Sequence, residues 1–453
     1  MPDATIWNSY GLTADPYSIL PLTEGGALSV DQVFVGRQEE LGVLMQTMTG
    51  ERVTMLINGN VGVGKTSLLN FHKHRCRSLK KETPFLAPRR EIEATSDLLH
   101  KKTFLLEILS TLYWEVKLID PTKVERDDFL KKIGAIVDFT SRIELNTSSS
   151  LSAGFAGINV AESRSVAPPM ELTINSIEHR LEEFVEWIRN NDVAGKKHKG
   201  IIIHMNNFDV ALRENVGVVR HFFDEIRDTL QMKYLFFFLL GPSDFYHDAV
   251  ADNPRIRAVC APPLCLQPLS KTELCDALDR RYERLRINKF IAYIPPLSKE
   301  AIYSFYDIFN GDIRSILSTC RELVEGKGSQ SLQNVGREEA FAMLGKLKWE
   351  AMKRMGIDTP AFRSVVEYIT EHPEGVIQTD VAKALKKVRS NMAGYYFKEL
   401  KQKGIVEQVL ADDENKQDKR VKYWKFTRDF QVLYFYKNAA QAVQRSQEQL
   451  SLL

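Results

Sequence analysis

The sequence predicts a three-layer α/β fold, with helices on both faces of a parallel sheet, followed by two smaller domains. Three observations predict it. A glycine-rich loop at residues 59–66 lies between an apolar strand at 53–57 and a helix at 67–79. Apolar strands and helices then alternate as far as residue 269, as in parallel sheets. The remaining residues are first all-helical and then change to three short helices and a hairpin.

The composition is that of a globular protein with several domains. The 453 residues are 44% apolar, and the net charge is only +2, so any basic surface must be local. The five cysteines (76, 260, 265, 275 and 320) lack a C-x-x-C spacing, which argues against a disulfide framework or structural zinc. The N-terminus does not read as a signal peptide, and the longest apolar run, 234–240, is too short to span a bilayer. We therefore expect a cytoplasmic protein without a membrane partner.

The glycine-rich loop matches the phosphate-binding pattern G-x-x-x-x-G-K-[ST] in full. Its residues are Gly59, Asn60, Val61, Gly62, Val63, Gly64, Lys65 and Thr66, followed by Ser67. Glycines allow backbone N–H groups to curl around phosphate oxygens, and the helix N-terminus adds a favourable dipole. We expect Lys65 to reach the outer phosphates and the Thr66 hydroxyl to take one position on Mg²⁺. The alternative is a flexible glycine turn with a surface lysine.

The other elements of the sheet follow in order. Strands are predicted at 85–94, 201–209, 234–240 and 264–269, and helices at 97–117 and 211–231. Residues 271–325 read as all-helical and contain Gly311-Asp312-Ile313-Arg314. The ligand is expected at the carboxyl ends of the strands.

The order of these segments resembles the AAA+ ATPases, in particular the replication-initiator type that includes the origin-recognition proteins. The matching segments, over about 30–325, are F-V-G-R at 34–37, the glycine-rich loop, the strand ending at 209, G-P-S at 241–243, P-L-S-x-x-E-L from 268 and G-D-I-R at 311–314.

The resemblance implies ATP and Mg²⁺ as cofactors and a homo-oligomer. It assigns the adenine pocket to Val35, Gly36 and Arg37. It assigns a sensor to Ser243, a γ-phosphate contact to Arg314 and a finger toward a neighbouring subunit to Arg255 or Arg257. The two last arginines read alternatively as plain surface charges.

One departure from the resemblance bears on hydrolysis. AAA+ proteins usually end the third strand with Asp and Glu, whereas this chain has Asn206 and Asn207. An amide carries no charge and cannot act as a base at neutral pH. We therefore expect strong ATP binding with slow or partner-stimulated hydrolysis. Asp209, or Glu91 and Glu93 on the second strand, are candidate substitutes. If the strand register differs by a few residues, Asp209 is instead the magnesium ligand.

The last third of the chain resembles a winged helix-turn-helix. Helices at 361–371, 379–386 (with Thr379 as N-cap) and 390–403 precede strands at 405–410 and 421–426. The helix from 390 would be the recognition helix, with Met392, Tyr396 and Leu400 facing inward. The residues that we expect to contact DNA are Arg389, Asn391, Tyr395, Lys398, Lys419 and Arg420.

Charge favours double-stranded DNA as the partner of this domain. Residues 376–427 contain twelve Lys or Arg and seven Asp or Glu, a local excess of +5. Winged helices also serve as protein-docking modules, and the acidic run 412–414 at the wing tip leaves that alternative open.

The predicted domains are an N-terminal extension (1–30), an AAA+ core (31–269), a helical lid (270–332), a connecting helix (333–358), a winged helix (359–430) and a C-terminal helix (431–453). An insert at about 118–175 contains a small, glycine-rich run at 146–161 that suggests a hairpin or a mobile loop, with Arg164 just beyond it.

Two functions fit this domain organisation. One is an ATP-dependent DNA-binding switch, and the other is a regulatory ATPase similar to STAND proteins, whose winged helix docks an effector protein.

Overall fold

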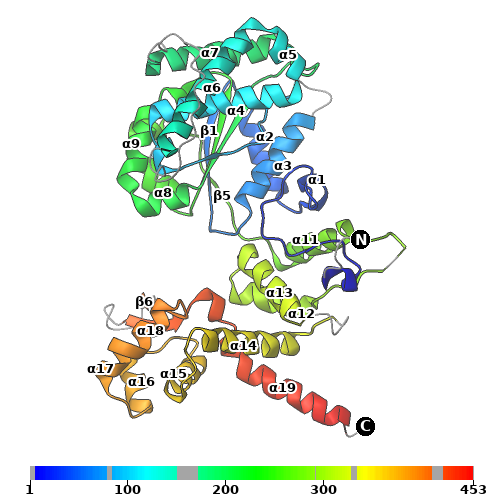
Figure 1. Ribbon diagram of the computed structural model, residues 1–453, viewed down its shortest axis with the longest axis vertical. Coiled ribbons are helices and arrows are strands. Elements are labelled where there is room, and N and C mark those ends of the chain that lie inside the picture. The colour runs from blue at the N-terminus through cyan, green and yellow to red at the C-terminus, as the bar shows by residue number, and fades with distance from the viewer. Residues whose placement is uncertain are drawn as a thin grey trace, which may run out of the picture. The chain divides into compact units, whose positions relative to one another are not determined.

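The computed structural model describes residues 6–78, 84–149, 172–290, 292–327, 334–410 and 422–451. The chain divides into two compact units, which are residues 21–267 (the core unit) and residues 1–20 together with 268–453 (the C-terminal unit). Figure 1 labels many of the helices and strands of both units. Within the described ranges, no helix is long and apolar enough to cross a membrane.

The core unit is built on a five-stranded parallel sheet. Its strands are β1 (Val53–Asn58), β2 (Ile92–Glu93), β3 (Ile201–Asn206), β4 (Leu235–Gly241) and β5 (Leu264–Cys265). They lie in the order β2-β3-β4-β1-β5. Leu239 of β4 lies opposite both Leu56 of β1 and Met205 of β3, so these three strands end at nearly the same level. The sheet confirms the predicted fold class.

Helices cover both faces of this sheet. They are α1 (Val30–Val33), α2 (Gln38–Thr47), α3 (Lys65–Ser78), α4 (Lys101–Ile119), α5 (Pro121–Arg126), α6 (Asp128–Ser149), α7 (Ile174–Asn190), α8 (Phe208–Glu214), α9 (Val216–Ile226) and α10 (Pro254–Arg257), with short turns η2 (Ser96–Leu98), η3 (Thr229–Gln231) and the π-helical η4 (His247–Ala251).

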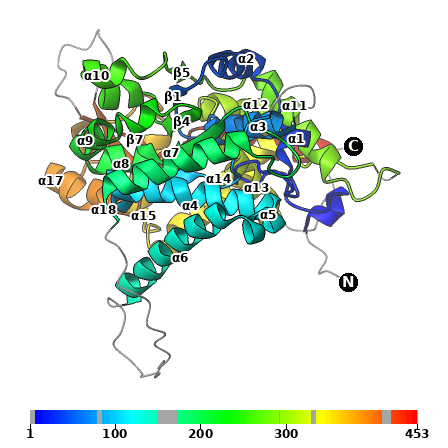
Figure 2. The ribbon, with the colours of Figure 1, turned by 90° about the horizontal axis from the view of Figure 1, so that it is seen from above.

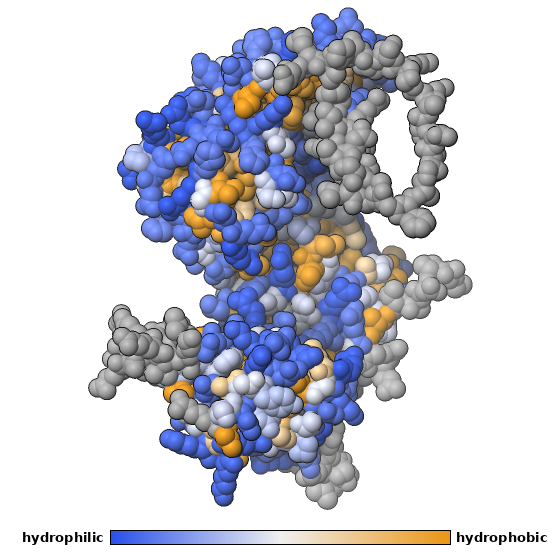
Figure 3. Space-filling view, turned by 60° about the vertical axis from the view of Figure 1, so that its left-hand side comes forward, coloured by the Kyte–Doolittle hydropathy of each residue, from blue (hydrophilic) through white to orange (hydrophobic). Residues whose placement is uncertain are grey.

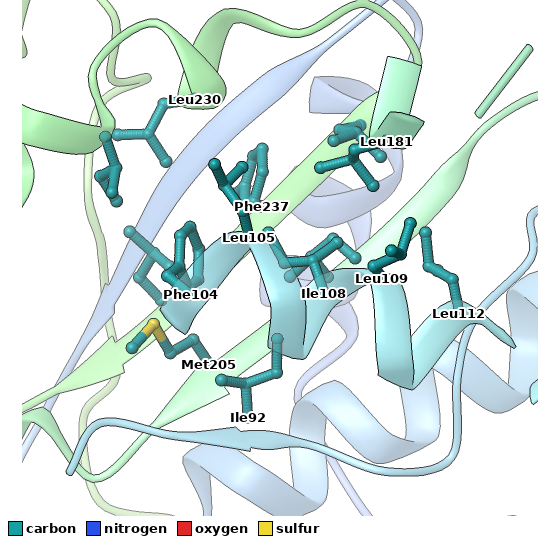
Figure 4. Close-up of a cluster of buried hydrophobic side chains, with 14 of the residues drawn as sticks. Ile92, Phe104, Leu105, Ile108, Leu109, Leu112, Leu181, Met205, Leu230 and Phe237 are labelled. Atoms are coloured by element: carbon teal, nitrogen blue, oxygen red, sulfur yellow. The ribbon is translucent and has the colours of Figure 1, made fainter. Parts of the chain in front are cut away.

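The two faces alternate along β4 because successive side chains of a strand point in opposite directions. Phe236 and Phe238 pack in the cluster that contains side chains of α2 and α3. Phe237 packs in the cluster with Phe104 and Leu105 of α4. Figure 4 shows these α4 side chains directed at Phe237, Met205 and Ile92.

Several predicted elements differ from the structure. The strand expected at 201–209 ends at Asn206, and the strand expected at 264–269 is limited to Leu264–Cys265. The strand expected at 85–94 is reduced to one bridge at Leu86 and to β2, because Pro88 lies between them and has no N–H for the ladder. The helix expected at 211–231 is divided at Asn215, whose side chain accepts hydrogen bonds from the first N–H groups of α9.

The described part of the insert expected at about 118–175 is mainly helical. Residues 118–149 form the end of α4, then α5 and α6, and Figure 2 shows α6 running out beside α4. Leu130, Ile133 and Val137 of α6 are buried at helical spacing. The hairpin or loop expected at 146–161 falls almost wholly on residues 150–171, which lie outside the described residues together with Arg164.

The C-terminal unit begins with three lid helices and continues into the winged-helix pattern. Its elements are η1 (Ile6–Tyr10), α11 (Lys271–Arg284), α12 (Lys299–Ile308), α13 (Ile313–Lys327), α14 (Arg337–Arg354), α15 (Pro360–Thr370), α16 (Gln378–Ala384), α17 (Arg389–Asn391), the π-helical η6 (Met392–Tyr396), α18 (Phe397–Gln402), β6 (Val406–Leu410), β7 (Lys422–Phe426), η7 (Arg428–Phe430) and α19 (Leu433–Ser451). Strands β6 and β7 pair antiparallel. Thr379 is not the N-cap of α16 as expected, because that helix starts one residue earlier with Ile377 as N-cap.

Residues 6–20 pack on the lid helices of the same unit, which the sequence did not reveal. The buried hydroxyls of Tyr17 and Tyr282 are 2.8 Å apart. Arg281 donates to the carbonyls of Pro16 and Ser18 at 2.9 and 3.0 Å.

Polar and charged side chains dominate the face of the molecule in Figure 3, and apolar side chains there form separate small groups.

Candidate functional site

The glycine-rich loop curves tightly between β1 and α3. Gly62 and Gly64 have φ angles of 85° and 93°, in the left-handed region that side chains disfavour. At Gly59 a Cβ would lie 3.0 Å from the carbonyl oxygen of Leu266 and from Val63. The loop therefore requires glycine at these positions, and it leads the chain directly into the N-terminus of α3, where free N–H groups favour an anion.

Lys65 is the first residue of α3, and its ammonium group folds back over the loop. It donates to the carbonyl oxygens of Gly59 and Asn60 at 2.7 and 3.0 Å. Thr66 is half-buried in the first turn of α3. The Ser67 hydroxyl accepts the N–H of Leu22 at 3.3 Å, so it is tied to the segment preceding α1.

Arg37 holds the loop from the other side. Its guanidinium is 7% exposed and donates to the carbonyls of Val63 at 3.1 Å and Gln267 at 2.6 Å, while it pairs with Glu40 at 2.8 Å. Gly36 and Arg37 both have positive φ angles, which turn the arginine inward. Arg37 therefore joins the phosphate loop to the chain that follows β5. A role of Val35, Gly36 and Arg37 toward adenine stays a prediction.

Ser243, which follows β4, reaches the same loop. Its hydroxyl donates to the side-chain oxygen of Asn60 at 2.5 Å. The two lie 183 residues apart in the sequence, and the order of the sheet brings them together because β4 is the neighbour of β1.

Two asparagines, Asn206 and Asn207, lie at the end of β3, where the resemblance implies an aspartate and a glutamate. Asn206 is the last residue of β3 and is 7% exposed, and its side-chain oxygen has no hydrogen-bond partner. Asn207 is exposed, with a φ angle of 65°, and precedes α8. Asp209 lies inside α8, three residues past the strand, where it pairs with Arg213 at 3.0 Å.

Two glutamates lie beside Asn206, and two basic side chains lie near one of them, Glu91. Glu93 of β2 is its register partner, and Glu91 precedes β2 by one residue. Burial raises the pKa of Glu91, while Lys73 and a hydrogen bond from the Asn206 side chain act against this rise. Burial lowers the pKa of Lys73, on α3, to about 8, and that of His204, on β3, well below its usual range. Sequence reasoning missed Lys73 and His204, and the only signal was a histidine within an apolar strand.

These residues fit a Mg²⁺ ion held mainly through water. In the described part of the chain, no group of three His, Cys, Asp or Glu could hold a metal ion by itself. Mg²⁺ usually keeps several waters and takes few protein ligands. The Thr66 hydroxyl is a direct ligand candidate, and the unpartnered oxygen of Asn206 is an acceptor for a metal-bound water.

The predicted finger residues lie on the short helix α10, and the predicted lid arginine lies on the longer helix α13. Arg255 and Arg257 are exposed on α10, which Asn253 caps. Arg314 is exposed at the start of α13, in the C-terminal unit. The buried carboxylate of Asp312 caps this helix and accepts the N–H groups of Arg314 and Ser315 at 3.0 and 3.3 Å.

Asp312 also connects the lid to the winged-helix region within the C-terminal unit. Its carboxylate pairs with the guanidinium of Arg428, which follows β7. The Ser315 hydroxyl donates to the same carboxylate at 3.0 Å. In the sequence, Asp312 stands out only as part of the G-D-I-R segment at 311–314.

The expected recognition helix is α17, η6 and α18, a helix interrupted by a π-helical turn. Asn391, Tyr395 and Lys398 are exposed on it, and Met392 and Leu400 are buried. Tyr396, expected inside, is half-buried and accepts a hydrogen bond from Lys387 at 3.3 Å. Arg389 begins α17, but its side chain is outside the described structure, as are Lys419 and Arg420 altogether. π-Helical turns are often found at functional sites.

No protein-family model matches this sequence, and no curated protein matches it. Solved structures of similar fold include the Aeropyrum pernix ORC1 protein in complex with DNA, which is 15% identical and aligns over 95% of this chain and 96% of its own, with a TM-score of 0.43. The Aeropyrum pernix ORC2 protein, in ADPNP–ADP complexes, aligns over 91% and 97% at 13% identity and a TM-score of 0.40. CDC6P from Pyrobaculum aerophilum aligns over 93% and 99% at 13% identity and a TM-score of 0.39.

Proposed function

We propose that this chain is an ATP-binding switch of the AAA+ type that assembles with itself and binds double-stranded DNA through its C-terminal unit. The observation that carries the proposal is the conformation of the phosphate loop. Two left-handed glycines, Lys65 at the start of α3 and the fixing contacts of Arg37 and Ser243 form a preorganised cradle for phosphates.

We expect nucleotide binding to be strong and hydrolysis to be slow or dependent on a partner. The phosphate-binding groups are complete, whereas the last residue of β3 is a neutral amide. Losing a general base typically lowers the rate about 10²- to 10⁴-fold. Slow hydrolysis suits a switch, because the nucleotide-bound state then persists.

DNA binding is inferred from the exposed side of the recognition helix. Asn391, Tyr395 and Lys398 are directed to solvent on α17–α18, and the surrounding sequence carries the local excess of positive charge. Amide, hydroxyl and ammonium groups on one helix surface suit contacts with phosphates and base edges. Proteins that neutralise several phosphates lose affinity steeply as salt rises.

The test is to measure mass in solution with and without ATP and duplex DNA. We compare wild type with Lys65→Ala, Arg389→Ala and Lys398→Ala, with Lys346→Ala on the exposed side of α14 as the control for charge. Lys65→Ala should lose the nucleotide-dependent assembly, and Arg389→Ala and Lys398→Ala should lose only DNA. Normal assembly and DNA binding by Lys65→Ala would show that the switch mechanism is wrong.

A regulatory ATPase that docks an effector protein is the second candidate. The observation in its favour is the missing carboxylate at Asn206 and Asn207, which suits a nucleotide-held state that rarely turns over. It predicts little DNA affinity at any salt concentration. A steep decrease of DNA affinity with salt would exclude it.

A further inference from the structure

Strand β2 brings two glutamates to the place where β3 ends in an amide. Glu93 lies opposite Asn206 in the parallel register, one position after the pair of Ile92 and Met205. Ile92 and Met205 both belong to the core on the α4 side. Because side chains alternate along a strand, Glu93 and Asn206 share the opposite face, together with Glu91.

Buried polar atoms on this face are left without partners. Asn206 is 7% exposed and His204 is 3% exposed. The oxygen of Asn206 and both ring nitrogens of His204 have no hydrogen bond, although the Nε2 atom of His204 lies 3.5 Å from the Glu91 carboxylate. Burying unsatisfied polar groups costs stability, so a strand built only for packing would place apolar residues here.

The two glutamates have different surroundings. The side chain of Glu91 is 30% exposed, accepts a hydrogen bond from the Asn206 amide and is attracted by the buried ammonium of Lys73. Glu91 lies two residues before Glu93 in the chain, so its backbone is about 6–7 Å further from the carboxyl end of the strand. Glu93 is exposed at the level of Asn206, where the ligand of a parallel sheet binds.

We propose that β2 supplies the carboxylate that β3 lacks, and that this substitute base supports the slow hydrolysis expected of the proposed function. Glu93 is the catalytic base. Glu91 is a positioning residue: it accepts a hydrogen bond from the side-chain nitrogen of Asn206, which leaves the side-chain oxygen of Asn206 free. The water oxygen bonds to the γ-phosphorus as the bond from that phosphorus to the bridging β–γ oxygen breaks, which yields ADP and phosphate. The water proton passes to Glu93 and then to solvent. This inference rests on the proposed function, because it requires ATP at the phosphate loop.

The experiment separates binding from hydrolysis. ATP affinity is measured by calorimetry, and hydrolysis by single turnover with excess protein, for wild type, Glu93→Gln and Glu91→Gln. Glu186→Gln, an exposed glutamate on α7, is the matched control. Glu93→Gln should keep the wild-type ATP affinity within about twofold and lower the hydrolysis rate by about 10²- to 10⁴-fold.

Glu91→Gln distinguishes positioning from simple structural support. Its rate should fall less than that of Glu93→Gln, and the acid limb of its pH–rate profile should move to lower pH, because one negative neighbour of the base has gone. Absence of ATP binding by the wild type would overturn the proposed function. Normal ATP binding with equal hydrolysis by wild type and Glu93→Gln, including none in either, would overturn the assignment of Glu93 alone.

Discussion

Removing the Arg428 guanidinium tests whether the lid and the winged-helix region are energetically connected. Arg428 is half-exposed, whereas its partner Asp312 is only 8% exposed. The carboxylate also caps α13 and bonds to Ser315, so these contacts remain when the arginine is removed. Arg428→Ala therefore leaves a buried carboxylate with one partner fewer.

The contacts of Asp312 set the size of the effect. A hydrogen bond to a charged group contributes about 1.5–3 kcal/mol, and the exposure of Arg428 reduces this to about 1 kcal/mol. In a unit of roughly 200 residues, 1 kcal/mol lowers the melting temperature by about 2–4 °C. Asp312→Ala removes the helix cap and the Ser315 contact as well, so we expect a loss of about 2–3 kcal/mol.

The assay is a double-mutant cycle followed by thermal unfolding. Arg428→Ala, Asp312→Ala and the double variant should give a coupling free energy of about 1 kcal/mol. Arg363→Ala, an exposed arginine on α15, should leave the melting temperature unchanged. Additive effects, with no coupling between Asp312 and Arg428, would refute the connection.

Three further predictions concern the core unit. Arg37→Lys should weaken ATP binding about tenfold in calorimetry, because lysine cannot reach the carbonyls of both Val63 and Gln267; equal affinity would contradict it. Gly64→Ala should cost about 1–2 kcal/mol in denaturant unfolding from backbone strain alone, since φ is +93° and no atom lies near the added Cβ; an unchanged midpoint would exclude this strain. Lys73→Met should raise the free energy of unfolding by about 1–3 kcal/mol at pH 7. Because burial lowers the pKa of Lys73 from 10.5 to about 8, the unfolded chain binds more protons between these values, so the gain should vanish as pH rises through them; a constant gain would be contrary evidence.

Local patterns in the sequence were sufficient for the phosphate loop and most of the strands. The loop was predictable because its glycines, lysine and threonine act within eight consecutive residues. The C-terminal helices and hairpin were predictable for the same reason, since caps, turns and alternation are local signals. The strand predicted at 85–94 is longer than the observed one because Pro88 has no N–H for pairing with a neighbouring strand.

The contacts that complete the candidate site depend on the order of the strands. Ser243 meets Asn60 because β4 lies beside β1, and Glu93 meets Asn206 because β2 lies beside β3. A sequence shows which residues end each strand but not which strands are neighbours, and the hydrogen bond from Arg37 to Gln267 likewise depends on the position of β5. The residues that hold phosphate were thus determined by short-range chemistry. The residues that contact the phosphate loop, in contrast, are determined by contacts between segments up to 230 positions apart in the sequence, and only the folded chain creates these contacts.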